Sequence, residues 1–300
     1  CTYAQAHWQA ANRRKPLPLY VPEDCKTLRE AVKRVAQDSR ITTIVLGEGE
    51  HVVNVLKDEW GNESNTLEIL SAMSIVGRPD VPKEMIVVVG GIWFKKGIEG
   101  NCHLQHLTLR QAKLMGVIGY SSFTMEDVVV EQSGYSGVRA VSPGVVGRCT
   151  NVEVRQCGWS GVSVANGASI TLIGAKTTVH HNCTRRGFGG HYGLFVCGSS
   201  STIQLVPPLT KEQVSLDNGE YGNWGAGGGA DINQIKTIAA TSTPSSSVPH
   251  GETKSNHESP PRRDDLLRLP DHVFTAKVVP FFGFKDYALA SCAAQYLQAH

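Results

Sequence analysis

The sequence has little of several features that mark whole classes of protein. Aromatic residues make up 7% of its 300 residues, and basic and acidic residues are nearly balanced at 29 and 27. The longest apolar run, residues 85–94, contains two glycines and is about half the ~20 residues that a membrane span requires. We therefore expect no membrane segment and, since neither sign of charge dominates, no general affinity for nucleic acid.

Two further features are missing from the sequence. The chain begins at Cys1 with no basic segment followed by an apolar stretch, so we expect that a signal peptide is absent or already removed. No pair of its eight cysteines has the CxxC spacing of zinc sites, and 300 residues is long for a scaffold held by disulfides. The sequence thus predicts no metal, no cofactor and mainly free thiols, which favour a reducing compartment.

What the sequence does contain is a repeat. The string HLTLRQ at residues 106–111 returns as DVVVEQ at 127–132 and as NVEVRQ at 151–156, with a shorter copy at 178–182. Aligning these copies places in one column Leu109, Val130, Val154 and Val179, at intervals of 21, 24 and 25 residues. A second column contains Gly116, Gly137, Gly161 and Gly193, and a third contains Leu104, Met125 and Cys149.

Each repeat has three short segments in which apolar residues alternate with others, and alternation with period two predicts strands. The gaps between them are too short for the crossover helices of a doubly wound sheet. A unit of this size buries its inward face only by stacking on the next unit. The sequence therefore predicts an all-β fold, a right-handed parallel β-helix built from 21–25-residue coils.

An amphipathic helix is predicted ahead of the coils. Thr27 and Glu30 have the spacing of a capping box, and four apolar residues follow at the spacing of one helical face: Leu28, Ala31, Val32 and Val35. Since the open end of a solenoid exposes its core, we expect this helix, at about residues 27–38, to cover that end.

The predicted helix is followed by a strand, a glycine-rich turn and coils that contain CGWSGV (157–162) and VHHNC (179–183). In this order of elements the chain resembles the pectin-lyase-like superfamily of right-handed β-helix proteins. The resemblance covers residues 24–237. It implies the fold but no single activity, because the superfamily includes lyases, glycosidases, adhesins and non-catalytic modules. The aspartate cluster and the Gly-His-Gly and Arg-Ile-Lys strings of its polygalacturonases have no match here.

Outside the coils we predict an N-terminal extension at residues 1–23, a Ser/Thr/Pro-rich linker at 238–265 and a poorly defined C-terminal tail at 266–300. Within them, Cys149 and Cys157 occupy columns that other coils fill with residues unable to form disulfides, so we interpret both as buried free thiols. Two polar columns are interpreted as structural: an amide column of Gln111, Gln132, Gln156 and His181, and a charged column of Arg110, Glu131, Arg155 and His180.

Catalysis has weak support in the sequence. Acidic residues of the repeats occupy different strand positions instead of forming the carboxylate pair of a glycosidase. A metal-free lyase acting on an acidic glycan remains the alternative, and its candidate residues are Arg139, Lys176, His180 and His191. Residues 103–205 contain 8 basic and 4 acidic residues, an excess that attracts such a glycan.

The most suggestive surface feature is a turn column containing Leu114, Tyr135, Trp159 and His191, followed in the next strand by Arg139, which alternation predicts to point outward. Rings in neighbouring coils can form a platform on which a sugar or a peptide stacks, or they can fold back to cover the coil edge. We predict a non-catalytic module that binds a glycan or a protein partner along one lateral face through Tyr135, Trp159, Arg139 and His191. No catalytic residue is assigned.

Overall fold

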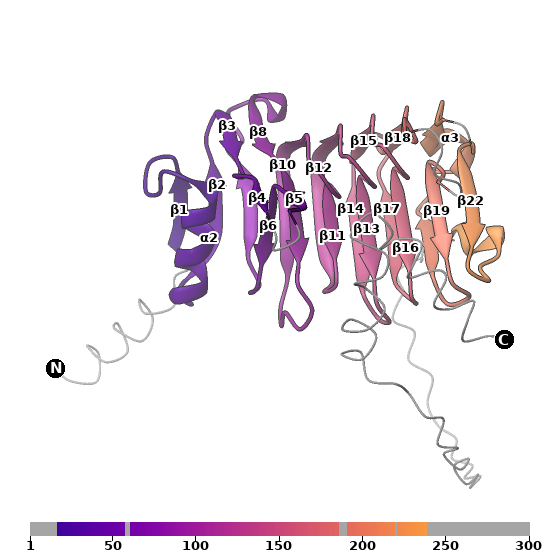
Figure 1. The fold of residues 1–300 in the computed structure, drawn as a ribbon, viewed down its shortest axis with the longest axis horizontal. Coiled ribbons are helices and arrows are strands. Elements are labelled where there is room, and N and C mark those ends of the chain that lie inside the picture. The colour runs from indigo at the N-terminus through magenta and orange to yellow at the C-terminus, as the bar shows by residue number, and fades with distance from the viewer. Residues whose placement is uncertain (1–16, 58–60, 186–190, 220, 239–300) are drawn as a thin grey trace, which may run out of the picture.

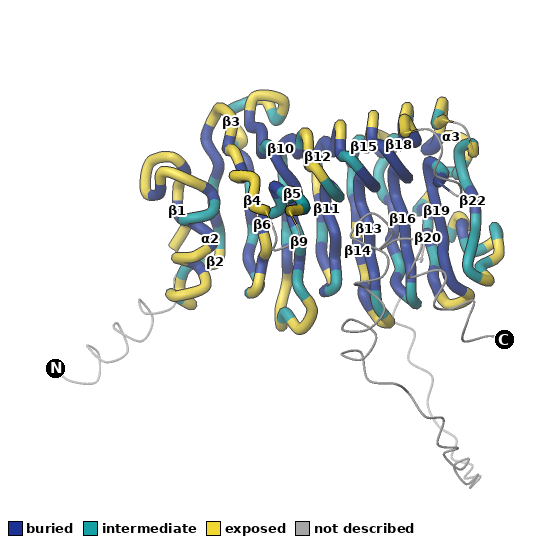
Figure 2. Tube along the Cα trace, in the orientation of Figure 1, coloured by how far each residue is buried: buried dark blue, intermediate teal, exposed yellow. Residues whose placement is uncertain are grey.

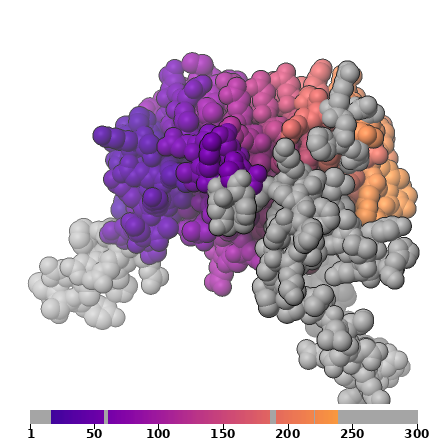
Figure 3. Space-filling model, viewed as in Figure 1, coloured from indigo at the N-terminus to yellow at the C-terminus, as the bar shows by residue number. Residues whose placement is uncertain are grey.

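The computed structural model describes residues 17–57, 61–185, 191–219 and 221–238, which form one elongated stack of coils (Figure 1). The predicted tail and all of the predicted linker except Ile238 lie outside these residues. In Figure 3 the described atoms run from the N-terminal coils at one end to the C-terminal coils at the other. The first strand begins at Leu17, within the segment predicted as an N-terminal extension.

Within the described residues, 14 strands form a long sheet that bends around the stack. Its continuous order is β1 (Leu17–Val21), β2 (Ile41–Leu46), β7 (Ser74–Gly77), β10 (Cys102–Arg110), β12 (Phe123–Glu131), β14 (Val146–Thr150), β17 (Ser169–Ile173), β20 (Thr202–Leu205) and β23 (Ile235–Thr237). Joined to this path are β3 (Gly49–Val52), β8 (Ile86–Val89), β15 (Glu153–Arg155), β18 (Thr178–His180) and β21 (Ser215–Leu216).

A short sheet closes the other side of the stack. Its seven described strands are β6 (Thr66–Ile69), β9 (Gly91–Phe94), β11 (Val117–Gly119), β13 (Val138–Val141), β16 (Val162–Ala165), β19 (Leu194–Cys197) and β22 (Trp224–Gly227). The remaining elements are the antiparallel pair β4 (Leu56–Lys57) and β5 (Glu63–Ser64), the helices α2 (Leu28–Gln37) and α3 (Lys211–Val214), and the 3₁₀ turns η1 (Lys83–Met85) and η2 (Ile232–Gln234). Every pairing in the two larger sheets is parallel, so the chain is an all-β parallel β-helix, as predicted.

The predicted register of the coils is confirmed. Leu109 pairs with Val130, Val130 with Val154 and Val154 with Val179, and all four side chains are fully buried. In the third column, Leu104 pairs with Met125 and Met125 with Cys149. Since the same columns repeat from coil to coil, one apolar core runs through the whole stack (Figure 2).

Two polar columns mark the corners at which each coil bends. One contains His106, Asp127 and Asn151, with φ between 51° and 53°, and the other contains Gln111, Gln132, Gln156 and His181, with φ between 54° and 57°. This left-handed region is costly for most residues other than glycine, and less so for Asn, Asp and His. The predicted amide column is confirmed, because the Gln111 side chain donates to Gln132 and the Gln132 side chain to Gln156, at 3.4 and 3.3 Å.

The glycine column reflects close packing between the two sheets. A Cβ atom on Gly137 would lie 2.4 Å from Cγ1 of Val154, and a Cβ on Gly116 or Gly161 would lie equally close to Val130 or Val179. Glycine is therefore required at these positions because the neighbouring coil's valine occupies the space of any larger residue.

Helix α2 forms as predicted. The Thr27 hydroxyl accepts a hydrogen bond from the Glu30 amide at 3.2 Å, which caps the first turn. Its four predicted apolar residues are buried and belong to the central core, so the helix covers the N-terminal end of the stack, as Figure 1 shows.

The predicted free thiols are also present. Cys25, Cys102, Cys149, Cys157 and Cys183 are free and buried. Burial raises the pKa of Cys149 to about 12 and that of Cys157 to about 11, so both are neutral fillers of the core. Among the described residues, no group of His, Cys, Asp or Glu side chains is arranged to bind a metal, and no helix is long and apolar enough to cross a membrane.

The predicted charged column is a ladder of ion pairs along the long sheet. The buried Glu131 carboxylate accepts hydrogen bonds from Arg110 and from Arg155, the latter at 2.7 and 2.9 Å. Arg155 also pairs with Glu153 at 2.6 Å, and His180 lies 3.2 Å from the same carboxylate. These side chains are therefore engaged with one another, in line with the structural interpretation.

Candidate binding face

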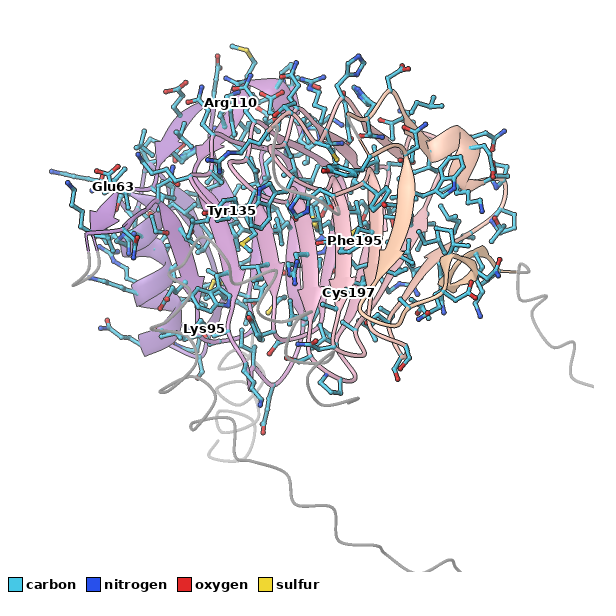
Figure 4. The ribbon with its side chains drawn as sticks, turned by 45° about the vertical axis from the view of Figure 1, so that its right-hand side comes forward. Glu63, Lys95, Arg110, Tyr135, Phe195 and Cys197 are labelled. Atoms are coloured by element: carbon cyan, nitrogen blue, oxygen red, sulfur yellow. The ribbon has the colours of Figure 1, made fainter. Side chains whose placement is uncertain are left out.

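The outer face of the short sheet presents one row of side chains across successive strands. The row contains Trp93, Ile118, Arg139, Ser163 and Phe195, which are paired in register from β9 to β19. Their neighbours along each strand point into the core, because side chains alternate between the two faces. Figure 4 labels Phe195 and Tyr135 on this side of the stack.

Arg139 is the unusual member of this row. Arg139 is only 5% exposed, and its side chain takes part in no hydrogen bond or ion pair among the described residues. Burial lowers the pKa of Arg139, and Tyr120 nearby opposes that shift. A buried cation without a partner is strongly disfavoured, so the site is poised to accept an anion.

Two unpartnered polar atoms lie beside Arg139. Ser163 is its direct neighbour on β16, and the buried Ser163 hydroxyl has no hydrogen-bond partner among the described residues. The buried His191 Nε2 is unpartnered in the same sense. Burial first, and then the charge of Arg139, lowers the pKa of His191 to about 4, so the imidazole is neutral at pH 7.

The predicted aromatic column forms a continuous stack. The rings of Tyr135 and Trp159 have centroids 4.1 Å apart, and those of Trp159 and His191 are 4.4 Å apart at 11°. Residue exposure is 7% for Tyr135 and 1% for Trp159, and the guanidinium of Arg185 lies 5.6 Å from the Tyr135 ring. The rings therefore pack face to face on one another, as side chains do when they cover the coil edge. The stack also places His191 where the charge of Arg139 acts on it.

The other lyase candidates lie elsewhere. His180 is on β18 of the long sheet and contacts Glu153 and His181, while Lys176 is exposed in the turn that precedes β18. Of the four basic candidates, the structure thus brings together only Arg139 and His191.

Alternation along the strands places Ser163 beside Arg139 on the outer face, but sequence reasoning missed a polar groove on the long sheet. This polar groove has a volume of about 330 Å³ and is lined by Ser74, Asn101, His103, Thr124, Met125, Glu126, Arg148 and Thr150. Most of these residues occupy outward strand positions, which the alternation of the repeats could have identified. The exposed Arg148 gives the groove a cation of its own.

No protein-family model and no curated protein matches the chain. Among solved structures, the chain is similar to the catalytic domain of a GH87 alpha-1,3-glucanase, with 14% identity and a TM-score of 0.26 over 64% of this chain and 46% of that one. It is also similar to the A-module of the Azotobacter vinelandii mannuronan C-5 epimerase AlgE4, with 11% identity and a TM-score of 0.26 over 78% of this chain and 97% of that one. The chain thus spans less than half the length of the glucanase domain.

Proposed function

We propose that this β-helix is a binding module for an acidic glycan, held on the outer face of the short sheet by an ion pair between Arg139 and a uronate carboxylate. The observation that carries the proposal is the burial of Arg139 with no hydrogen-bond or ion-pair partner in the described part of the chain. A guanidinium offers two parallel donors that match a carboxylate, and the interaction is stronger in a site from which water is excluded.

A sugar acid fits the neighbours of Arg139 better than a simple anion does. Ser163 donates and accepts through its hydroxyl, and the neutral His191 presents one ring nitrogen without a partner. A uronate has a carboxylate for Arg139 and ring hydroxyls for these two groups. Tyr135 and Trp159 enter the proposal as the stack that holds His191 in place.

Binding is tested with polygalacturonate and with its methyl-esterified form, which keeps the sugars and removes their charge. We expect the parent protein to bind the acid form. We expect Arg139→Met to weaken this binding about tenfold or more, because the ligand's charge loses its partner. Isothermal titration calorimetry at several salt concentrations measures both effects.

The matched control is Arg148→Met, which removes an exposed arginine from the polar groove of the long sheet. It should leave polygalacturonate binding unchanged. Equal affinity of parent and Arg139→Met, equal binding of the esterified form, or loss of binding only in Arg148→Met would each contradict the proposal.

A lyase is the second candidate, because Arg139 lies next to a histidine that is neutral at pH 7. In β-elimination, Arg139 would neutralise the uronate carboxylate and His191 would take the C5 proton. The C4–oxygen bond would break as a C4–C5 double bond forms, and the departing oxygen would take a proton from water. A histidine with a pKa of about 4 is a weak base for a carbon-bound proton, which is why we rank binding first.

We therefore expect that incubation with polygalacturonate or alginate yields no unsaturated product. The assay measures near-ultraviolet absorbance, which such a product would raise. Product that forms in the parent and is lost in His191→Gln, with glycan binding retained, would establish the lyase instead.

A further inference from the structure

A second hollow lies at the N-terminal end of the short sheet, away from Arg139. It has a volume of about 420 Å³ and is bounded by α2, by the β4–β5 pair and by strands β6 and β9. This volume is within the range of about 300–1,000 Å³ typical of small-molecule sites.

Three buried polar atoms in its lining have no hydrogen-bond partner among the described residues: Arg29 Nη2, Ser71 Oγ and Trp93 Nε1. They come from α2, from the turn after β6 and from β9, segments that are distant in the sequence. An arginine and an indole nitrogen can only donate, and a hydroxyl can donate as well. The hollow therefore offers donors to a ligand that accepts hydrogen bonds.

The charges around the hollow favour an anion. Both carboxylates of its lining are already paired: Glu63 with Lys57 and Lys113, at 3.3 and 2.7 Å, and Glu68 with Lys95 at 3.1 Å. Arg29 has no ion pair with a described residue. A ligand that supplies one negative charge would satisfy the Arg29 guanidinium, and Trp93 Nε1 lines the same hollow as a second donor.

Most of the remaining lining is apolar, namely Val32, Ala36, Leu56, Leu67, Leu70, Met73 and Leu114, and the other residues are Lys33, Asn62, Ser64 and Thr66. The apolar part of the wall suits a hydrocarbon chain better than a sugar, because most of a sugar's hydroxyls would lie against apolar side chains. We propose that this hollow binds an amphipathic monocarboxylate, such as a medium-chain fatty acid, with its carboxylate at Arg29 and Trp93 and its chain along the apolar wall.

The probes are dodecanoate, used below its micelle concentration, and dodecanol, which has the same chain without the charge. Calorimetry with the whole protein should show dodecanoate binding at least tenfold tighter than dodecanol. Arg29→Met should weaken dodecanoate binding about tenfold or more and leave dodecanol unaffected, because a charge-assisted hydrogen bond is lost. Trp93→Phe keeps an aromatic ring and removes the N–H donor, so it should weaken dodecanoate binding about threefold or more.

The matched control is Arg34→Met, on the same helix, where the arginine is exposed and paired with Glu30 at 2.8 Å. It should bind dodecanoate like the parent. No binding of dodecanoate, equal affinity for dodecanol, or unchanged affinity in Arg29→Met would overturn the proposal. If Arg29→Met fails to fold, unchanged affinity in Trp93→Phe overturns it.

This site is independent of the glycan proposal, since Ile118 stands between Trp93 and Arg139 in the outer row. Arg139→Met should therefore leave dodecanoate binding unchanged, and Arg29→Met should leave polygalacturonate binding unchanged. Failure of either proposal is thereby distinguished from failure of the other.

Discussion

Val154→Asp should destabilise the protein by about 4 kcal/mol or more, because it places a charge without a partner in the shared core. Val154 is fully buried on β15, between Val130 and Val179 of the neighbouring coils, and its Cγ1 lies directly against Gly137. Close packing leaves no space for water beside the new carboxylate. For a domain of this size, we expect the melting temperature to fall by about 10 °C or more, measured by circular dichroism.

The matched control for this variant is Val146→Asp. Val146 lies at the start of β14, one strand away, and is 40% exposed, so its aspartate stays in water. We expect its melting temperature to remain close to that of the parent. A Val154→Asp protein that unfolds near the parent temperature would be incompatible with the inward column and with the register of the coils.

Glu131→Gln should destabilise the protein by about 2 kcal/mol at neutral pH, because the Glu131 carboxylate accepts hydrogen bonds from Arg110 and Arg155 on both sides. The two arginines remain about one-third exposed, so water compensates part of the loss. Urea denaturation of the parent and the variant measures the difference in unfolding free energy.

The pH dependence of that difference identifies its origin. Burial alone would raise the pKa of Glu131, but hydrogen bonds from Arg110 and Arg155 prevail and hold it below its ordinary value of 4.5. The carboxylate therefore stabilises the fold above its unfolded pKa, and this contribution is lost as the pH falls through the lower folded pKa. The difference in unfolding free energy between the parent and Glu131→Gln should therefore become smaller below about pH 4.5.

Glu126→Gln is the control for the Glu131 variant, because Glu126 lies on the same strand, β12, and is exposed. Its unfolding free energy should equal that of the parent at neutral and at acidic pH. A stability difference for Glu131→Gln that stays constant from neutral to acidic pH would show that charge pairing is not its source.

The repeat predicts the fold because coil stacking depends on local pattern. Alternation along each strand determines which side chains point inward, and the interval between copies determines which of them meet, as for Leu109, Val130 and Val154. The glycine and amide columns are visible for the same reason, since every coil bends and packs in the same way. Membership of the pectin-lyase-like superfamily stays a prediction from the strings at residues 157–162 and 179–183.

Alternation also placed Arg139 on the outer face, and the turn column placed Tyr135, Trp159 and His191 in one row. Only the assembled stack shows how deeply these side chains are buried and that Arg139 has no partner within the described ranges. The hollow at Arg29 could not be predicted from the sequence, because its donors come from α2, from the turn after β6 and from β9, at positions that share no sequence pattern.

The sequence by itself thus determined the solenoid, its register, its capping helix and the outward direction of Arg139, because each depends on spacing along the chain. The tertiary structure alone decided that the rings stack on one another. It also decided that Arg139, Ser163 Oγ and His191 Nε2 have no hydrogen-bond partner among the described residues. It also decided that Arg29 and Trp93, whose donors have no partner among the described residues, line one hollow. The physical reason is that burial and hydrogen-bond partners depend on every segment that packs nearby, including segments far apart in the sequence.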